Sequence, residues 1–241
     1  MVFPDLSRRD RQPELMDDPA IPDDKHRLAL RGLARLNRAS GIVGTVWRAL
    51  EPLARELKEP IRVLDMACGS GDLAVGVGER AARAGVPMAL SGCDLSPTAL
   101  DATLARARGA GLAIHTFEAD VTKNALEGEY DAVMSHLFFH HLEEDAIVDL
   151  LRRMEASARR LVLVTDLIRD RHGYALAWLA SRVLTRSSVV HVDALLSVRA
   201  ALRPDELTSL AERAGLGGAS VRQVWPRRMV LTVEKGGADA N

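Results

Sequence analysis

Acidic side chains recur at the ends of apolar runs in this sequence. Asp65, Asp94, Asp120 and Asp166 each close a run that predicts a strand, and Ser135-His136 closes another. In a parallel sheet the carboxyl ends of the strands share one edge, and ligands bind there. Acidic side chains that lie side by side at that edge repel one another, which costs electrostatic energy unless a cationic or hydroxyl-rich ligand is present. The pattern therefore predicts a binding site for such a ligand.

Residues 61–74, IRVLDMACGSGDLA, are the most informative of these segments. An apolar run leads to Asp65, a turn of small residues follows, and a helix is expected from Asp72. Glycines in the turn let the backbone approach a ligand with no Cβ in the way. Strand, glycine turn and helix in this order hold nucleoside-bearing cofactors in α/β sheets.

Two kinds of cofactor fit this turn at first sight. The pattern G-x-G-x-x-G/A begins at Gly69, and Asp94 lies about 20 residues beyond its end, as in a dinucleotide site. A dinucleotide, however, places a pyrophosphate at the helix N-terminus. Asp65 and Asp72 flank that position and would repel it. A ligand with cations near the turn is favoured, and S-adenosylmethionine (SAM) carries an ammonium, a sulfonium and no phosphate.

The segment VLDMACGSGDLA resembles motif I of class I SAM-dependent methyltransferases. The segments GCDLSP, around Asp94, and EADVTKNAL, around Asp120, resemble motifs II and III of the same family. The usual motif I has glycine where this chain has Ala67. The resemblance covers about residues 60–166 and is strongest to small-molecule methyltransferases of the ubiquinone/menaquinone type and of bacterial natural-product pathways. It implies SAM as the cofactor and S-adenosylhomocysteine as its product.

The resemblance also implies roles for individual residues. Asp94 would accept hydrogen bonds from the ribose hydroxyls, and Leu95 would pack on the adenine. Asp120 would accept from the adenine amino group, while the Val121 amide donates to a ring nitrogen. Asp94 could instead cap the helix that starts at Pro97, and Asp120 could cap the short turn that follows it. The residues expected at the cofactor are Asp65, Ala67, Gly69, Gly71, Asp94, Leu95, Asp120, Val121, Ser135 and His136.

The candidate catalytic residues are His140 and His141, in SHLFFHHLEED. An imidazole with a pKa near 6.5 could remove a phenol or alcohol proton as the methyl group arrives. The alternative is structural, with one histidine packing the loop against the next helix and the other exposed. The sequence shows no convincing cluster of metal ligands, so no metal is expected.

Alternating strands and helices must position these residues. The expected strands are 61–65, 88–94, 113–119, 130–136 and 160–166, followed by a late hairpin of 219–225 and 228–234. The expected helices are 25–39, 42–57, 71–84, 97–108, 143–157 and 204–214, with a short helical turn near 122–127. This alternation predicts an α/β fold with a parallel sheet covered on both faces. The resemblance implies a Rossmann-like three-layer sandwich with seven strands in the order 3-2-1-4-5-7-6, strand 7 antiparallel, and an N-terminal helical lid.

Two regions are expected to shape the substrate side of the site. Residues 1–57 are predicted to form a tail and lid helices, and residues 58–241 the SAM-binding domain. In the lid, Asn37 or Arg38 could meet the methionine carboxylate. Residues 167–202 break the strand-helix rhythm and are predicted to be a substrate-side insertion.

The insertion offers several side chains for substrate binding. These candidates are His172, Tyr174, Trp178 and His191. If the segment were extended, His191 and Asp193 would share one face. They could then form a His–Asp pair or a surface salt bridge.

Composition narrows the class of protein. The 241 residues carry a formal net charge of −1, which gives no bulk attraction to nucleic acid. No apolar run approaches the roughly 20 residues of a membrane span, and the polar N-terminus does not resemble a signal peptide. We therefore expect a cytoplasmic monomer or homodimer acting on a small molecule, with Cys68 and Cys93 as reduced thiols.

The sequence thus predicts methyl transfer from SAM to a small molecule of secondary metabolism by in-line SN2 displacement. The expected acceptor atom is an oxygen of a phenolic, quinol or polyketide-like compound, and the protein mainly aligns the reactants and excludes water. One alternative is a SAM-binding fold recruited to cyclisation or decarboxylation. Another is a nicotinamide-dependent oxidoreductase.

Overall fold

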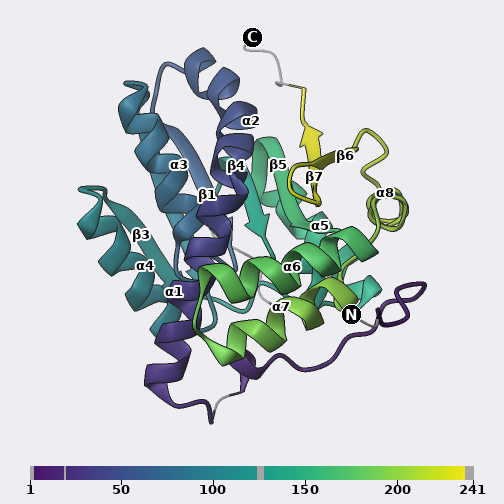
Figure 1. The fold of residues 1–241 in the computed structure, drawn as a ribbon. Helices are drawn as coiled ribbons and strands as arrows, with labels where there is room; N and C mark the ends of the chain where they lie inside the picture. The colour runs from purple at the N-terminus through teal and green to yellow at the C-terminus, as the bar shows by residue number, and fades with distance from the viewer. Residues whose placement is uncertain (1–2, 19, 124–127, 237–241) are drawn as a thin grey trace.

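A seven-stranded sheet forms the centre of the molecule. The computed structural model describes residues 3–18, 20–123 and 128–236 (Figure 1). The strands are β1 (Ile61–Met66), β2 (Met88–Asp94), β3 (Ile114–Glu118), β4 (Tyr130–His136), β5 (Ala158–Leu167), β6 (Ser220–Val224) and β7 (Arg228–Glu234). Their order is β3-β2-β1-β4-β5-β7-β6. Strands β1 to β5 pair in parallel, and β7 runs antiparallel to both β5 and β6. The predicted fold class and strand order are confirmed.

Helices cover both faces of this sheet. They are α1 (Asp23–Ser40), α2 (Ile42–Glu56), α3 (Asp72–Arg83), α4 (Pro97–Gly109), α5 (Glu144–Ser157), α6 (Arg171–Leu184), α7 (Ser188–Ala200) and α8 (Pro204–Arg213), with short 3-10 turns η1 (Leu15–Asp17) and η2 (Phe139–His141). In β1, Val63 belongs to the core beneath α2 and α3, whereas Leu64 belongs to the core beneath α5 and α8. This alternation is what a strand buried on both faces requires. No helix among the described residues is long and apolar enough to cross a membrane.

The insertion is a pair of helices. Helices α6 and α7 occupy most of residues 167–202 and lie across the carboxyl edge of the sheet (Figure 1). They contact α1, which is the predicted lid helix. The helical turn expected near 122–127 falls mostly on residues 124–127, outside the described residues. Residues 121–123 form a turn.

The N-terminal segment 3–18, called the strap below, crosses beneath α7 on its way to α1 (Figure 1). Arg9 donates hydrogen bonds to the carbonyl oxygens of Ala200 and Leu142. The carbonyl of Leu6 accepts from the side chains of Arg169 and Arg203. These bonds fix the strap against elements that lie far along the chain.

Arg169 is the buried charge on which this arrangement depends. Its side chain is 1% exposed, pairs with Glu206 at the start of α8, and donates to the Leu6 and Ala201 carbonyls. We predict that Arg169→Met lowers the free energy of unfolding by about 3 kcal/mol, because one carboxylate and two carbonyls each lose a buried, charged hydrogen-bond donor. Urea unfolding of wild type and variant measures the difference.

The matched control is Arg171→Met, since Arg171 is exposed on α6 two positions away. It is expected to change stability by less than about 0.5 kcal/mol. Equal losses in the two variants would contradict the role given to Arg169.

Candidate active site

A cavity of about 1100 Å³ lies at the carboxyl edge of the sheet. Its walls come from the strap, α1, α6, α7, the loops that follow β1, β2, β3 and β4, and the turn between β6 and β7. Pockets for one drug-sized ligand usually measure roughly 300–1,000 Å³. The cavity is therefore large enough for two ligands side by side.

The glycine turn after β1 has a left-handed backbone at three positions. The φ angles of Ala67, Gly69 and Gly71 are 54°, 54° and 67°. At Gly71 a Cβ would also lie 2.6 Å from Thr103 Cγ2, so this position lacks space as well. Ala67 stands where the family pattern has glycine, and its conformation costs on the order of 1 kcal/mol. The turn keeps its shape despite this strain.

Asp65 is buried beneath this turn with its charge unsatisfied. It is 1% exposed, and neither carboxyl oxygen has a hydrogen-bond partner among the described residues. Burial, together with the charges of Asp72 and Asp94, raises the pKa of Asp65 well above its usual value. A donor or cation in the cavity would stabilise its ionised form.

Asp94 organises the turn from the neighbouring strand. It accepts hydrogen bonds from the amides of Gly69 at 2.8 Å and Ser96 at 2.9 Å. Ser96 caps α4 by accepting a hydrogen bond from the Ala99 amide. Asp94 is therefore not the residue that caps this helix. Leu95 lies at the cavity with 62% of its surface exposed, as a side chain that packs on a planar ligand would.

Asp120 caps the turn that follows it, which is the alternative to binding a ligand. It accepts from the backbone and hydroxyl of Thr122 and pairs with Lys123 at 2.9 Å. Hydrogen bonds from Thr122 and Lys123 lower the pKa of Asp120 to about 2. Asp120 and Val121 nevertheless line the cavity, so capping and ligand binding are compatible.

Arg228 lies in this site and was not found from the sequence. It begins β7, is buried, and its Nη2 donates to Asn37 Oδ1 at 2.9 Å. Asn37 in turn donates to Asp72 Oδ2 at 2.7 Å. Of the two lid residues considered, Asn37 lines the cavity, whereas Arg38 is exposed and is not among the lining residues.

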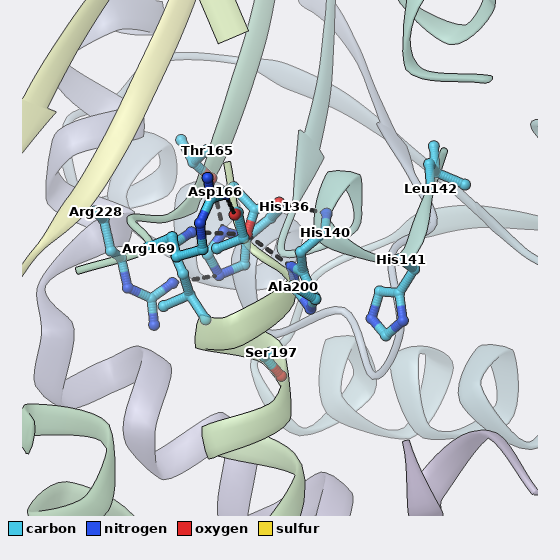
Figure 2. A network of polar contacts seen from close by, with 12 residues as sticks. His136, His140, His141, Leu142, Thr165, Asp166, Arg169, Ser197, Ala200 and Arg228 are labelled. Atoms are coloured by element: carbon cyan, nitrogen blue, oxygen red, sulfur yellow. Dashed lines mark hydrogen bonds and ion pairs between the residues drawn. The ribbon is translucent and has the colours of Figure 1, made fainter. Parts of the chain in front are cut away.

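His136 is held as a neutral imidazole beside Arg228 (Figure 2). Arg228 Nη1 lies 3.3 Å from His136 Nε2, so this nitrogen accepts and Nδ1 carries the proton toward Thr165 Oγ1 at 2.6 Å. Burial first, and then the charge of Arg228, lower the pKa of His136 to about 3. His136 lines the cavity, but Ser135 and Gly71, also expected at the cofactor, do not.

His140 and His141 both lie in the cavity wall (Figure 2). His140 is buried, with Nδ1 2.8 Å from Asp166 Oδ1 and Nε2 3.6 Å from Glu14 Oε1. Burial alone would lower the pKa of His140, but the charge and hydrogen bond of Asp166, together with the nearby Glu14 carboxylate, outweigh it and raise the pKa to about 10. His141 is partly exposed, with its Nδ1 3.4 Å from Asp17 Oδ2. One histidine is thus buried and paired, and the other is accessible.

The four residues expected to bind substrate do not line the cavity. His172 is exposed, Tyr174 packs against Phe3, and Trp178 stacks with Arg182. Helix α6 instead turns its small and aliphatic side toward the cavity. That side consists of Gly173, Leu176, Ala177, Ala180 and Leu184. The residues predicted to bind substrate on α6 therefore lie apart from the side chains of this helix that line the cavity.

The fourth expected residue, His191, lies in a helix and not in an extended segment. Its ring bonds to the Thr185 carbonyl, and Asp193 accepts from the amides of Leu15 and Met16 in the strap. The His191–Asp193 pair is therefore not formed. Asp193 anchors the strap to α7.

Cys68 and Cys93 are both buried free thiols, as expected. Burial is the main reason that the pKa of Cys93 rises to about 12. Both side chains are therefore neutral packing groups beside the glycine turn.

Residues 63–160 match the family described as a methyltransferase domain. The chain carries a methyltransferase domain. With its strand order and SAM-family motifs, this domain is of the class I, SAM-dependent type. The match favours methyl transfer over the nicotinamide alternative.

Solved structures share the fold of the methyltransferase domain, whereas no curated protein matches the sequence. Magnesium protoporphyrin IX methyltransferase from Synechocystis, crystallised with S-adenosylhomocysteine, is 14% identical with a TM-score of 0.58, covering 91% of this chain and 90% of its own. A putative O-methyltransferase from Nostoc punctiforme is 19% identical with a TM-score of 0.59, covering 81% and 56%. An O-methyltransferase family protein from Burkholderia thailandensis is 18% identical with a TM-score of 0.55, covering 90% and 64%. At such identities the likeness shows the fold.

The neutral state of His136 predicts a pH dependence of stability. In the unfolded chain this histidine titrates near its ordinary pKa of about 6.5, whereas the folded chain keeps it neutral down to about pH 3. Between these values the unfolded state binds one more proton, so the free energy of unfolding falls as pH drops, by up to about 1.4 kcal/mol per pH unit. Urea unfolding between about pH 6 and pH 4 measures this slope.

His136→Gln is expected to show a shallower slope than wild type over that window. His115→Gln is the control, because His115 is exposed on β3. Identical slopes in wild type and His136→Gln would show that His136 does not stay neutral on folding.

Proposed function

We propose that this chain transfers the methyl group of SAM to an oxygen of a small phenolic, quinol or polyketide-like acceptor. The observation that supports this best is the partnerless, buried Asp65 beside a left-handed glycine turn, flanked by Asp72 and Asp94, within a methyltransferase domain. Such a site favours a ligand with positive charge and no phosphate. SAM has both properties.

The cofactor would occupy the half of the cavity next to β1 and β2. Asp94 and Leu95 would hold the ribose and adenine, with Asp120 and Val121 at the far edge of the base. The methionine end would lie over Asp65, Ala67, Gly69 and His136. There Arg228 offers a guanidinium for the cofactor carboxylate, positioned through Asn37.

The acceptor would occupy the other half. Its walls are largely apolar side chains of three helices: Leu30 and Leu33 of α1, Leu176, Ala177 and Ala180 of α6, and Ala194 and Val198 of α7. A flat, mainly apolar molecule suits such a chamber. We propose that α1 and the strap, within residues 1–57, act as the lid that excludes water.

A group of neighbouring titratable side chains lines this chamber. Glu14, Asp17, His140 and His141 line it together. SAM supplies an electrophilic methyl group, so the residues here need only orient the acceptor and take its proton. We assign that proton to His141, a partly exposed imidazole in the cavity wall, and His140, held between Asp166 and Glu14, orients the loop.

Binding of S-adenosylhomocysteine tests the cofactor assignment. Calorimetric titration of the wild-type chain is expected to give a dissociation constant on the order of micromolar. Asp94→Ala should abolish detectable binding, because it removes the ribose acceptor and the Gly69 anchor. Asp101→Ala, on an exposed position of α4, should bind like wild type. Absence of binding by wild type, or tight binding of NADH in its place, would overturn the proposal.

The position of the acceptor chamber can be tested on α6. Ala180→Phe fills the chamber and is expected to lower kcat/KM at least about tenfold while leaving S-adenosylhomocysteine affinity unchanged. Leu179→Phe is the matched control, since Leu179 is 53% exposed on the other side of the helix. Mass spectrometry of a panel of phenols, catechols and naphthoquinols detects the gain of a methyl group. If both variants behave alike, the acceptor does not bind against this face.

A further inference from the structure

Three side chains with metal-binding atoms meet in the wall of the acceptor chamber. Glu14 of the strap and His140 and His141 of η2 each offer one ligand atom, and these atoms all lie within 4.8 Å of one another. Glu14 and His140 are buried, and His141 is partly exposed. All three line the cavity, so a bound ion would be reachable from it.

Each of these side chains is also held by a polar partner outside the group of three. Ser197 Oγ donates to Glu14 Oε1 at 2.5 Å. Asp166 engages His140 Nδ1, which leaves Nε2 directed toward Glu14. Asp17 lies 3.4 Å from His141 Nδ1. Histidines that bind metals are commonly held by a carboxylate on the other ring nitrogen, so this arrangement is typical of a metal site.

The distance between two of the candidate ligands also fits. His140 Nε2 and Glu14 Oε1 are 3.6 Å apart, longer than a direct hydrogen bond. Two ligands bonded at about 2.0–2.1 Å to one tetrahedral ion are separated by roughly 3.3 Å. A small inward movement of either side chain would bring both within bonding distance of a shared ion.

We propose that Glu14, His140 and His141 bind one divalent transition-metal ion, with Zn²⁺ as its representative. Two imidazoles and one carboxylate suit zinc, iron or nickel better than magnesium or calcium, which prefer oxygen ligands. Three protein ligands leave a coordination position open toward the cavity, as in catalytic zinc sites. An acceptor hydroxyl bound there would be fixed in place and would lose its proton more readily, with the proton passing to the Asp17 carboxylate or to solvent, because His141 would then bind the ion and not the proton. That last step rests on the proposed function, whereas metal binding does not.

The test uses the full chain without an affinity tag, stripped of metal with a chelator. Titration with ZnCl₂ is followed by calorimetry, and titration with CoCl₂ by visible absorption, which reports the coordination of Co²⁺. Wild type is expected to bind one equivalent of each ion. Glu14→Gln and His141→Gln should each weaken binding at least about tenfold, since even residues behind the ligands affect affinity about 10–100-fold.

His172→Gln is the matched control, because it removes an exposed histidine outside the cavity. It should bind both ions like wild type. S-adenosylhomocysteine titration of every variant reports folding and the cofactor site separately from the metal, so failure of one proposal does not imply failure of the other.

Two outcomes would overturn the metal site. One is no stoichiometric binding by wild type, in which case the three groups share a proton and not an ion. The other is binding that Glu14→Gln and His141→Gln leave unchanged, which places the ion elsewhere.

Discussion

Negative charge at the carboxyl edge of the sheet is the constraint on which the rest of the site depends. At the β5 end the chain neutralises its own carboxylate, because Asp166 bonds to the His140 ring and to two backbone amides. At the β1 end it does not, because Asp65 is buried between like charges with no hydrogen-bond partner among the described residues. The chain itself supplies hydrogen-bond donors to the carboxylate at the β5 end. At the β1 end the donors would have to come from a ligand. The proposed cofactor half of the cavity lies at the β1 end.

The three helices α1, α6 and α7 that cover this edge of the sheet are closely packed. A Cβ at Gly32 of α1 would lie 2.5 Å from Thr185 Oγ1, so only glycine lets α1 approach the α6–α7 hairpin at this depth. Small residues of α6 then face inward, and the cavity remains open beneath three helices. The helices approach closely at Gly32, while the small side chains of α6 leave space beside this contact. Together these two features explain how a 241-residue chain encloses so large a chamber.

Features set by short stretches of sequence were predictable, and features set by distant contacts were not. The glycine turn, the acids at the strand ends and the helix cap at Ser96 depend on neighbouring residues, and the structure has them where expected. The face that α6 turns inward depends on α1 and α7, so the aromatic residue type of Trp178 did not indicate that this side chain lies outside the cavity. A small-residue stripe from Gly173 to Ala180 was the available signal. Arg228 and Glu14 reach the site from opposite ends of the chain, and no local pattern marks them.

The strap has a consequence for how the molecule is made. Leu15 and Met16 bond to Asp193, and Leu6 bonds to Arg203, contacts that join positions 177 to 197 residues apart. The strap is synthesised before its partners and therefore has no docking site until α7 and the start of α8 have been synthesised. Contacts of such separation form late, after the local ones. The strands β1 to β5 and the glycine turn precede these partners in the chain, but the strap can close the acceptor chamber only after the start of α8 has been synthesised.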